Sequence, residues 1–142
     1  MREIVFRGKR IFDNGQWVEG CLLKVTLDGE TWHLIFGDDF QRSGLGITAM
    51  QHAAVNPATV GQYTGLKDKN GKRIFEGDIV KVQNEIMGSP FDEEVIGKIT
   101  YIECAYFIEP ENPMESLYLY DECAVYEVIG NIHDNHELLE VL

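Results

Sequence analysis

The chain has 142 residues, of which 44% are hydrophobic and 11% aromatic, and its formal net charge is −12 at pH 7. This composition is too apolar for a disordered protein, and the length is sufficient for one compact domain, or two small β modules, without disulfide or metal staples. No window approaches the roughly 20 consecutive apolar residues of a membrane-spanning helix, and the charged start does not resemble a secretory signal. We therefore expect a cytoplasmic protein that does not bind membranes.

The negative charge is concentrated in the second part of the chain. Residues 1–80 carry ten basic and ten acidic residues, whereas residues 81–142 carry fourteen acidic residues and two basic ones, Lys81 and Lys98. Such a surface repels nucleic-acid phosphates and anionic lipid, because proteins bind both through clustered lysine and arginine. We expect no direct nucleic-acid binding. Two roles for the charge stay open, namely solubility and contact with a basic partner protein.

Turn-forming dipeptides divide the first part of the chain into three predicted strands. Asn14-Gly15 and Asp28-Gly29 both tolerate the positive φ angles of tight hairpin turns. The runs beside them are rich in the β-branched, aromatic and large apolar residues that favour strands. We predict a three-stranded meander formed by residues 4–12, 17–26 and 31–36.

An irregular connection follows the meander. Residues 37–58 are rich in glycine, aspartate and serine, and alanine and methionine within them favour one helical turn at residues 48–55. This turn must end near Asn56, because Pro57 pushes the residue before it out of the helical region. The meander and this connection form a predicted N-terminal module over residues 1–60.

Residues 61–142 are predicted to form a second module, although a core shared with the first one stays open. A hairpin around Asn70-Gly71, which suits a two-residue type I′ turn, leads through Gly77 into a small closed sheet. Glycine and proline turn formers separate its strands. The predicted strands cover residues 79–83, 94–102, 104–109, 116–120 and 124–132, and a short helix covers residues 134–142.

Three segments of the sequence, in order, resemble the YopX family. The central one runs from residue 59 to residue 80 and reads TVGQYTGLKDKNGKRIFEGDIV. The opening MREIVFRGK with WVEG after it, and the closing YEVIGNIH with ELL after it, agree with the same family. The resemblance implies a bacteriophage or prophage protein of the bacterial cytoplasm, an SH3-like barrel in the C-terminal part, and self-association. It brings no cofactor and no catalytic residue.

The residues that carry this signature are interpreted as structural. Glycine, asparagine and aromatic residues in such a run fix turn geometry and core packing, and they do not form a catalytic constellation. No catalytic, cofactor-binding or metal-binding residue is therefore assigned. The structural signature consists of Gly61, Tyr63, Gly65, Asp68, Asn70, Gly71, Glu76, Gly77, Asp78, Gly130 and Asn131.

Two possible metal sites lack support in the sequence. The run from Asp68 to Gly71 does not match a calcium loop, because its glycine stands fourth rather than sixth and its twelfth position is Ile79. A zinc site would need His133 and His136 together with distant cysteines, and no paired-cysteine motif supports it. His33 is expected to be a half-buried packing residue. The cysteines of the hypothetical zinc site are Cys104 and Cys123.

The three cysteines and the carboxylate pairs point to no enzyme class. Cys21, Cys104 and Cys123 stand at wide spacing, which predicts reduced, partly buried thiols, although a bridge between the last two stays open. Glu76 and Asp78 could share a strand face, so weak hydrolase chemistry is conceivable, but carboxylates beside turns are usually solvated. No phosphate-binding or dinucleotide-binding glycine motif is present.

An aromatic group accompanies the acidic residues of the C-terminal half. With so few cations around them, these rings suit core packing or contact with a basic protein better than base stacking. The leading hypothesis is a non-enzymatic accessory protein that self-associates and binds a host or phage protein. The alternative is an acidic DNA mimic that occupies a nucleic-acid-binding protein. The aromatic residues are Tyr101, Tyr106, Phe107, Tyr118 and Tyr120.

Overall fold

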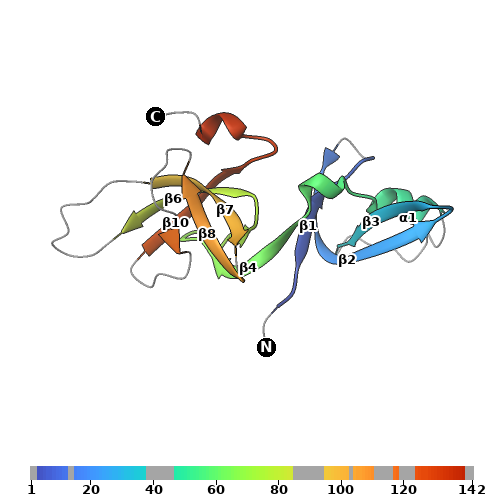
Figure 1. The fold of residues 1–142 in the computed structure, drawn as a ribbon, viewed down its shortest axis with the longest axis horizontal. Coiled ribbons are helices and arrows are strands. Elements are labelled where there is room, and N and C mark those ends of the chain that lie inside the picture. The colour runs from blue at the N-terminus through green and yellow to red at the C-terminus, as the bar shows by residue number, and fades with distance from the viewer. Residues whose placement is uncertain are drawn as a thin grey trace. The chain divides into compact units, whose positions relative to one another are not determined.

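The computed structural model describes residues 3–12, 15–37, 47–84, 95–102, 104–110, 117–118 and 124–139. The chain divides into two compact units, Met1–Tyr63 and Thr64–Leu142. Nearly all of the regular structure is antiparallel β-sheet, so the prediction of a mainly β fold is confirmed (Figure 1). Within the described residues, no helix has the length and apolar character needed to cross a membrane.

The N-terminal unit contains the predicted meander. It consists of β1 (Phe6–Lys9), β2 (Trp17–Leu27) and β3 (Glu30–Phe36), in the sheet order β3-β2-β1-β4. The strand β4 (Gly61–Lys67) pairs with β1 through its first residues and continues to β5 (Arg73–Phe75) in the C-terminal unit. The predicted helical turn is the helix α1 (Ile47–Ala53), and a 3-10 helix follows at Pro57–Thr59.

The sheet of the N-terminal unit buries side chains on both of its faces. Strand residues alternate between the faces, so Leu34 and Ile35 point in opposite directions. On one face, Leu34 packs against Ala53 and Ala54 at the end of α1. On the other face, Ile35 packs with apolar residues of β2 and of the segment after the helix, namely Val18 and Val55, with Phe6, Leu22 and Val60 around them.

The C-terminal unit is built on a second five-stranded antiparallel sheet, in the order β10-β6-β7-β8-β9. Its strands are β6 (Asp78–Asn84), β7 (Val95–Ile102), β8 (Ala105–Pro110), β9 (Leu117–Tyr118) and β10 (Ala124–Asn131). Within the described part of the chain, no pairing joins β9 to β10, so the predicted closure of the barrel is not seen there. Among the described residues of this unit, an apolar cluster is formed by Ile74, Val80, Val82, Ile99, Tyr106, Ile108 and Tyr126.

The predicted terminal helix over residues 134–142 is instead one 3-10 turn, His136–Leu139. Asn131 holds Asp134 and Asn135 in a turn, and the carbonyl of Asn135 accepts the N–H of Leu138 at 2.9 Å, so the helical turn begins only after Asn135. Leu139 is buried and anchors this turn. The prediction for the last three residues lies outside the described part of the chain.

Candidate functional site

The hairpin between β4 and β5 contains the centre of the predicted signature. The N–H of Asp68 donates to the carbonyl of Lys72 at 2.7 Å, and the N–H of Gly71 donates to the carbonyl of Asp68 at 3.0 Å. The loop therefore has three residues, and only Gly71 is left-handed, with φ of 81°. The predicted two-residue type I′ turn is wrong, because that turn would need Asn70 to be left-handed as well.

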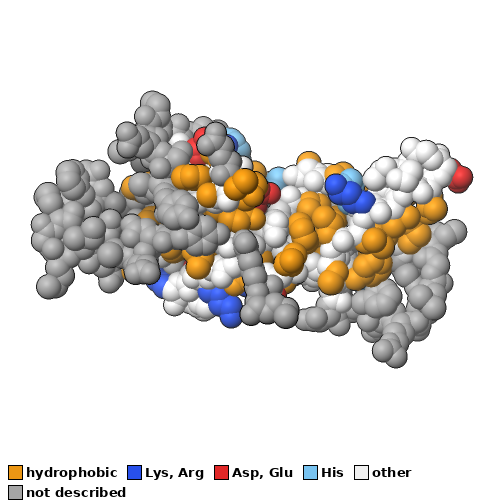
Figure 2. Space-filling view, turned by 60° about the horizontal axis from the view of Figure 1, so that its bottom comes forward, with side chains coloured by type: hydrophobic (Ala, Val, Ile, Leu, Met, Phe, Trp, Pro, Cys, Tyr) orange, Lys and Arg blue, Asp and Glu red, His pale blue; other side chains and the backbone are white. Residues whose placement is uncertain are grey.

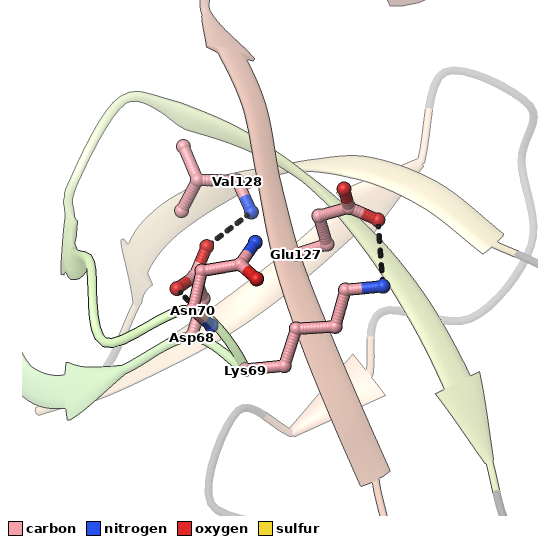
Figure 3. Close-up of polar contacts among 5 residues, drawn as sticks. All are labelled: Asp68, Lys69, Asn70, Glu127 and Val128. Carbon is pink, nitrogen blue, oxygen red and sulfur yellow. Dashed lines mark hydrogen bonds and ion pairs between the residues drawn. The ribbon is translucent and has the colours of Figure 1, made fainter.

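The carboxylate of Asp68 explains this difference. Its Oδ1 accepts the N–H groups of Asn70 and Lys72, both at 2.9 Å, so the side chain closes the loop from inside. Its Oδ2 accepts the N–H of Val128 on β10 at 3.0 Å (Figure 3). Only 7% of Asp68 is exposed. Burial by itself raises the pKa of this carboxyl, but the three backbone bonds and the nearby Lys72 charge outweigh it and hold the pKa below its usual value.

The same loop docks on one edge of β10. Besides the bond from Val128 to Asp68, the N–H of Lys69 donates to the carbonyl of Tyr126 at 2.9 Å. The Lys69 ammonium also lies 3.2 Å from Oε2 of Glu127 (Figure 3). Residues 126 and 128 direct their backbone groups to the edge opposite β6, because alternate residues of a strand point to alternate edges. The loop therefore satisfies backbone groups that an uncovered strand edge would expose.

A second signature turn joins β5 to β6. Oδ2 of Asp78 accepts the N–H of Phe75 at 2.8 Å, and only 1% of Asp78 is exposed. Gly77, with φ of 90°, donates its N–H to the carbonyl of Ile99 at 3.0 Å and accepts the N–H of Ile132 at 2.9 Å. Burial raises the pKa of the half-buried Glu76. The burial and the backbone bond of Asp78 support a structural role for this residue.

The third signature turn follows β10. The pairing of β10 with β6 shifts register between Val128 and Gly130. A Cβ atom at Gly130 would lie 2.7 Å from Oδ1 of Asn135, so this close approach requires glycine. Oδ1 of Asn131 accepts the N–H groups of His133 and Asp134 at 3.0 and 2.9 Å. The asparagine therefore shapes the chain reversal that leads to the last turn.

The remaining signature residues lie on β4. Gly61 is buried at the start of the strand, and Tyr63 is buried and donates its N–H to the carbonyl of Val5 at 2.7 Å. Gly65 has φ of 92°, a backbone conformation that residues other than glycine rarely adopt. The buried Thr64 beside it donates its hydroxyl to the carbonyl of Ile74 at 2.8 Å. The sequence interpretation missed Thr64, because a single threonine in a strand gives no signal of its own.

The described residues do not bring the candidate metal ligands together. Within the described residues, no group of three His, Cys, Asp or Glu side chains lies close enough to hold a metal ion. His133 and His136 are exposed near the last turn, Cys104 lies between β7 and β8, and Cys123 is outside the described residues. The prediction of partly buried thiols is wrong for Cys21 and Cys104, which are free and exposed. His33 is half-buried on β3, as expected.

The predicted aromatic group is only partly described. Tyr101 on β7 is exposed and its ring centroid lies 5.0 Å from that of the buried Tyr106 on β8. Phe107 is half-buried, whereas Tyr120 lies outside the described residues and only the backbone of Tyr118 is described. Most of the acidic residues of the C-terminal half also lie outside the described ranges, so the predicted acidic surface stays a prediction.

The comparisons with known proteins match nearly the whole chain. The family model described as YopX protein matches residues 6–140. Two solved structures are similar over 98% of this chain and 99% of their own: protein EF1440 from Enterococcus faecalis, at 25% identity and a TM-score of 0.49, and protein yopX from Bacillus subtilis, at 18% identity and a TM-score of 0.52. No curated protein matches the chain. The second structure supports the fold alone.

Proposed function

The chain belongs to the YopX family, and we propose that it is a non-enzymatic accessory protein of a bacteriophage or prophage. It acts in the bacterial cytoplasm, associates with copies of itself and binds a host or phage protein. The observation that carries the non-enzymatic assignment is the use of the signature side chains. Both carboxylate oxygens of Asp68, Oδ2 of Asp78 and Oδ1 of Asn131 accept hydrogen bonds from backbone N–H groups of their own unit.

This use of the signature distinguishes a scaffold from a catalyst. A general acid or base must reach the substrate with an oxygen or nitrogen that is not already committed to the fold. The carboxylate of Asp68 accepts three hydrogen bonds from the backbone, and the residue is nearly inaccessible to solvent. We further infer that the C-terminal unit is an SH3-like barrel. Such a barrel presents loops and a sheet surface to partner proteins.

Self-association and partner capture test this proposal directly. Light scattering over a wide range of protein concentration, combined with chemical cross-linking, should reveal an assembly larger than the monomer. A tagged copy of the full chain should recover a specific protein from infected host lysate. A monomer at every concentration, together with no specific protein in the pull-down, would contradict the proposal.

A second candidate function rests on the charge distribution. Residues 81–142 carry fourteen acidic residues and two basic ones, which suits a protein that imitates the phosphate backbone of DNA. Such a mimic should displace DNA from a host nucleic-acid-binding protein at low salt and lose this ability as salt screens the charges. Absence of competition at low salt would remove this candidate.

A further inference from the structure

A groove opens in the N-terminal unit between the β2–β3 hairpin and α1. Its volume is about 280 Å³, and it is lined by Leu27, Asp28, Glu30, Trp32, Met50 and Gln51. We propose that this groove binds an extended basic segment of a partner protein, which places one apolar side chain in the groove and a lysine or arginine beside Asp28 and Glu30. This inference rests on the proposed partner-binding function and assigns it a surface.

The groove exists because α1 covers only part of one sheet face. Leu34 lies on this face and is buried under the end of the helix. The strand register places Leu27 opposite Glu30 and Val25 opposite Trp32, on the same face as Leu34 but nearer the hairpin turn. There, 48% of Leu27 remains exposed. Figure 2 shows hydrophobic side chains gathered on the surface of this unit, at the right of the view.

The rim of the groove is acidic and has no counter-charge among the described residues. Asp28 and Glu30 are both exposed, and neither has an ion-pair partner there. The basic residues of the same hairpin are Lys24 and His33, which pair with each other. Each is the sequence neighbour of a residue on the groove face, so both lie on the opposite face of the sheet. Two carboxylates beside the indole of Trp32 favour a cation over any other group.

The edge of β3 favours an extended segment. β3 is the last strand of its sheet, and its outer edge already accepts one such contact, because the N–H of Val55 donates to the carbonyl of His33 at 2.9 Å. Thr31 lies two residues before His33 on the same strand, so its backbone groups point to the same edge. No described residue pairs with these groups. A partner segment that lies along the groove can therefore form main-chain hydrogen bonds with Thr31.

The direct test uses a peptide and the full chain. The probe is an acetylated and amidated Lys-Leu-Lys-Leu-Lys peptide, and its controls are Glu-Leu-Glu-Leu-Glu and Lys-Ser-Lys-Ser-Lys. We expect the first peptide alone to give saturable shifts of the backbone amide resonances of Thr31, Trp32 and Met50. Binding should weaken as salt is raised, because the Lys contacts are exposed.

Matched variants separate the charge contribution from the apolar one. The double variant Asp28→Asn, Glu30→Gln should lower the affinity for the Lys-Leu peptide about tenfold and make its binding less dependent on salt. The control Glu3→Gln, Glu19→Gln removes two charges elsewhere in the unit and should leave binding unchanged. Leu27→Ser should weaken binding by a similar factor. Leu23→Ser is its control, because Leu23 is 49% exposed on the same strand face but does not line the groove.

The outcomes distinguish this inference from the proposed function. No shift with the Lys-Leu peptide, equal shifts with the acidic peptide, or an equal loss in the control variants overturns the groove assignment. Concentration-dependent shifts of the same residues without peptide overturn it too, since a second copy would then occupy the groove. If lysate capture and self-association succeed in these cases, the proposed function stands. If the peptide binds but neither partner nor assembly is found, the groove assignment stands and the proposed function fails.

Discussion

Two hairpin turns of this protein share their residue types and differ in what the aspartate does. The turns at Asp28-Gly29 and at Asp68–Lys72 each contain an aspartate and a glycine whose φ is 81°. In the first, Leu27 pairs with Glu30, so the loop has two residues and Asp28 is itself left-handed, with φ of 50°. Its side chain is exposed. In the second, Asp68 stands before a three-residue loop and is buried.

The conformation of each turn is set by its own residues, whereas the role of its carboxylate depends on distant parts of the chain. Gly29 and Gly71 adopt their conformations because glycine has no Cβ, whatever surrounds them. Asp68 becomes structural because β10, 60 residues further along the chain, brings the N–H of Val128 to its free oxygen. No strand reaches Asp28 in the described structure, and its carboxylate stays at the rim of the groove.

The largest effect should come from replacing Asp68 by asparagine. Asp68→Asn turns one oxygen into an NH₂ group that faces backbone donors, so we expect the free energy of unfolding of the C-terminal unit to fall by about 2–3 kcal/mol. Amide hydrogen exchange of β6 and β7 in the full chain measures this loss. Asp28→Asn is the control and should change stability by less than about 0.5 kcal/mol, because asparagine tolerates the left-handed region.

Trp17 and Trp32 both lie in the N-terminal unit, so tryptophan fluorescence during urea unfolding reports on the Asp28→Asn control. A loss of similar size for both aspartates would contradict the distinction between an exposed turn residue and a buried structural one.

Acid should remove part of the Asp68 contribution. Its pKa is lowered below 3.8 in the folded protein, so its stabilising effect is complete above that pH and is lost as pH falls through the folded-state pKa. Urea unfolding followed by circular dichroism from pH 7 to pH 3 should show this loss in the wild type and its absence in Asp68→Asn. Burial raises the pKa of Glu76, so its protonation acts in the opposite direction, and Glu76→Gln serves to subtract it.

Much of the fold could be predicted from sequence because its signals are local. Dipeptides such as Asp28-Gly29 and alternating apolar runs predicted the meander and the mainly β class, and Pro57 correctly limited the helix before it. The loop at Asn70-Gly71 was predicted with the wrong length, because the Asp68 carboxylate and not the dipeptide decides it. The partner of that carboxylate is the backbone of Val128, and a backbone N–H carries no sequence signal.

The two glycines should cost the same when they are substituted. An added Cβ meets no atom within 4 Å at either Gly29 or Gly71, so the cost of alanine is backbone strain alone, about 1 kcal/mol in each turn. Tryptophan fluorescence in urea measures Gly29→Ala, and hydrogen exchange of β6 measures Gly71→Ala. Unequal losses would show that the Asp68 contacts also restrain the conformation of Gly71, which would couple the side chain to the local turn.

The smallest effect should come from the ion pair that accompanies the docked loop. Lys69 and Glu127 have side chains that are 46% and 36% exposed, so solvent screens their attraction. A double-mutant cycle of Lys69→Met and Glu127→Gln should give a coupling of only about 0.3 kcal/mol. The backbone bond from Lys69 to Tyr126 survives both substitutions. A coupling above about 1 kcal/mol would mean that exposed charge, and not the buried Asp68 carboxylate, holds this loop on β10.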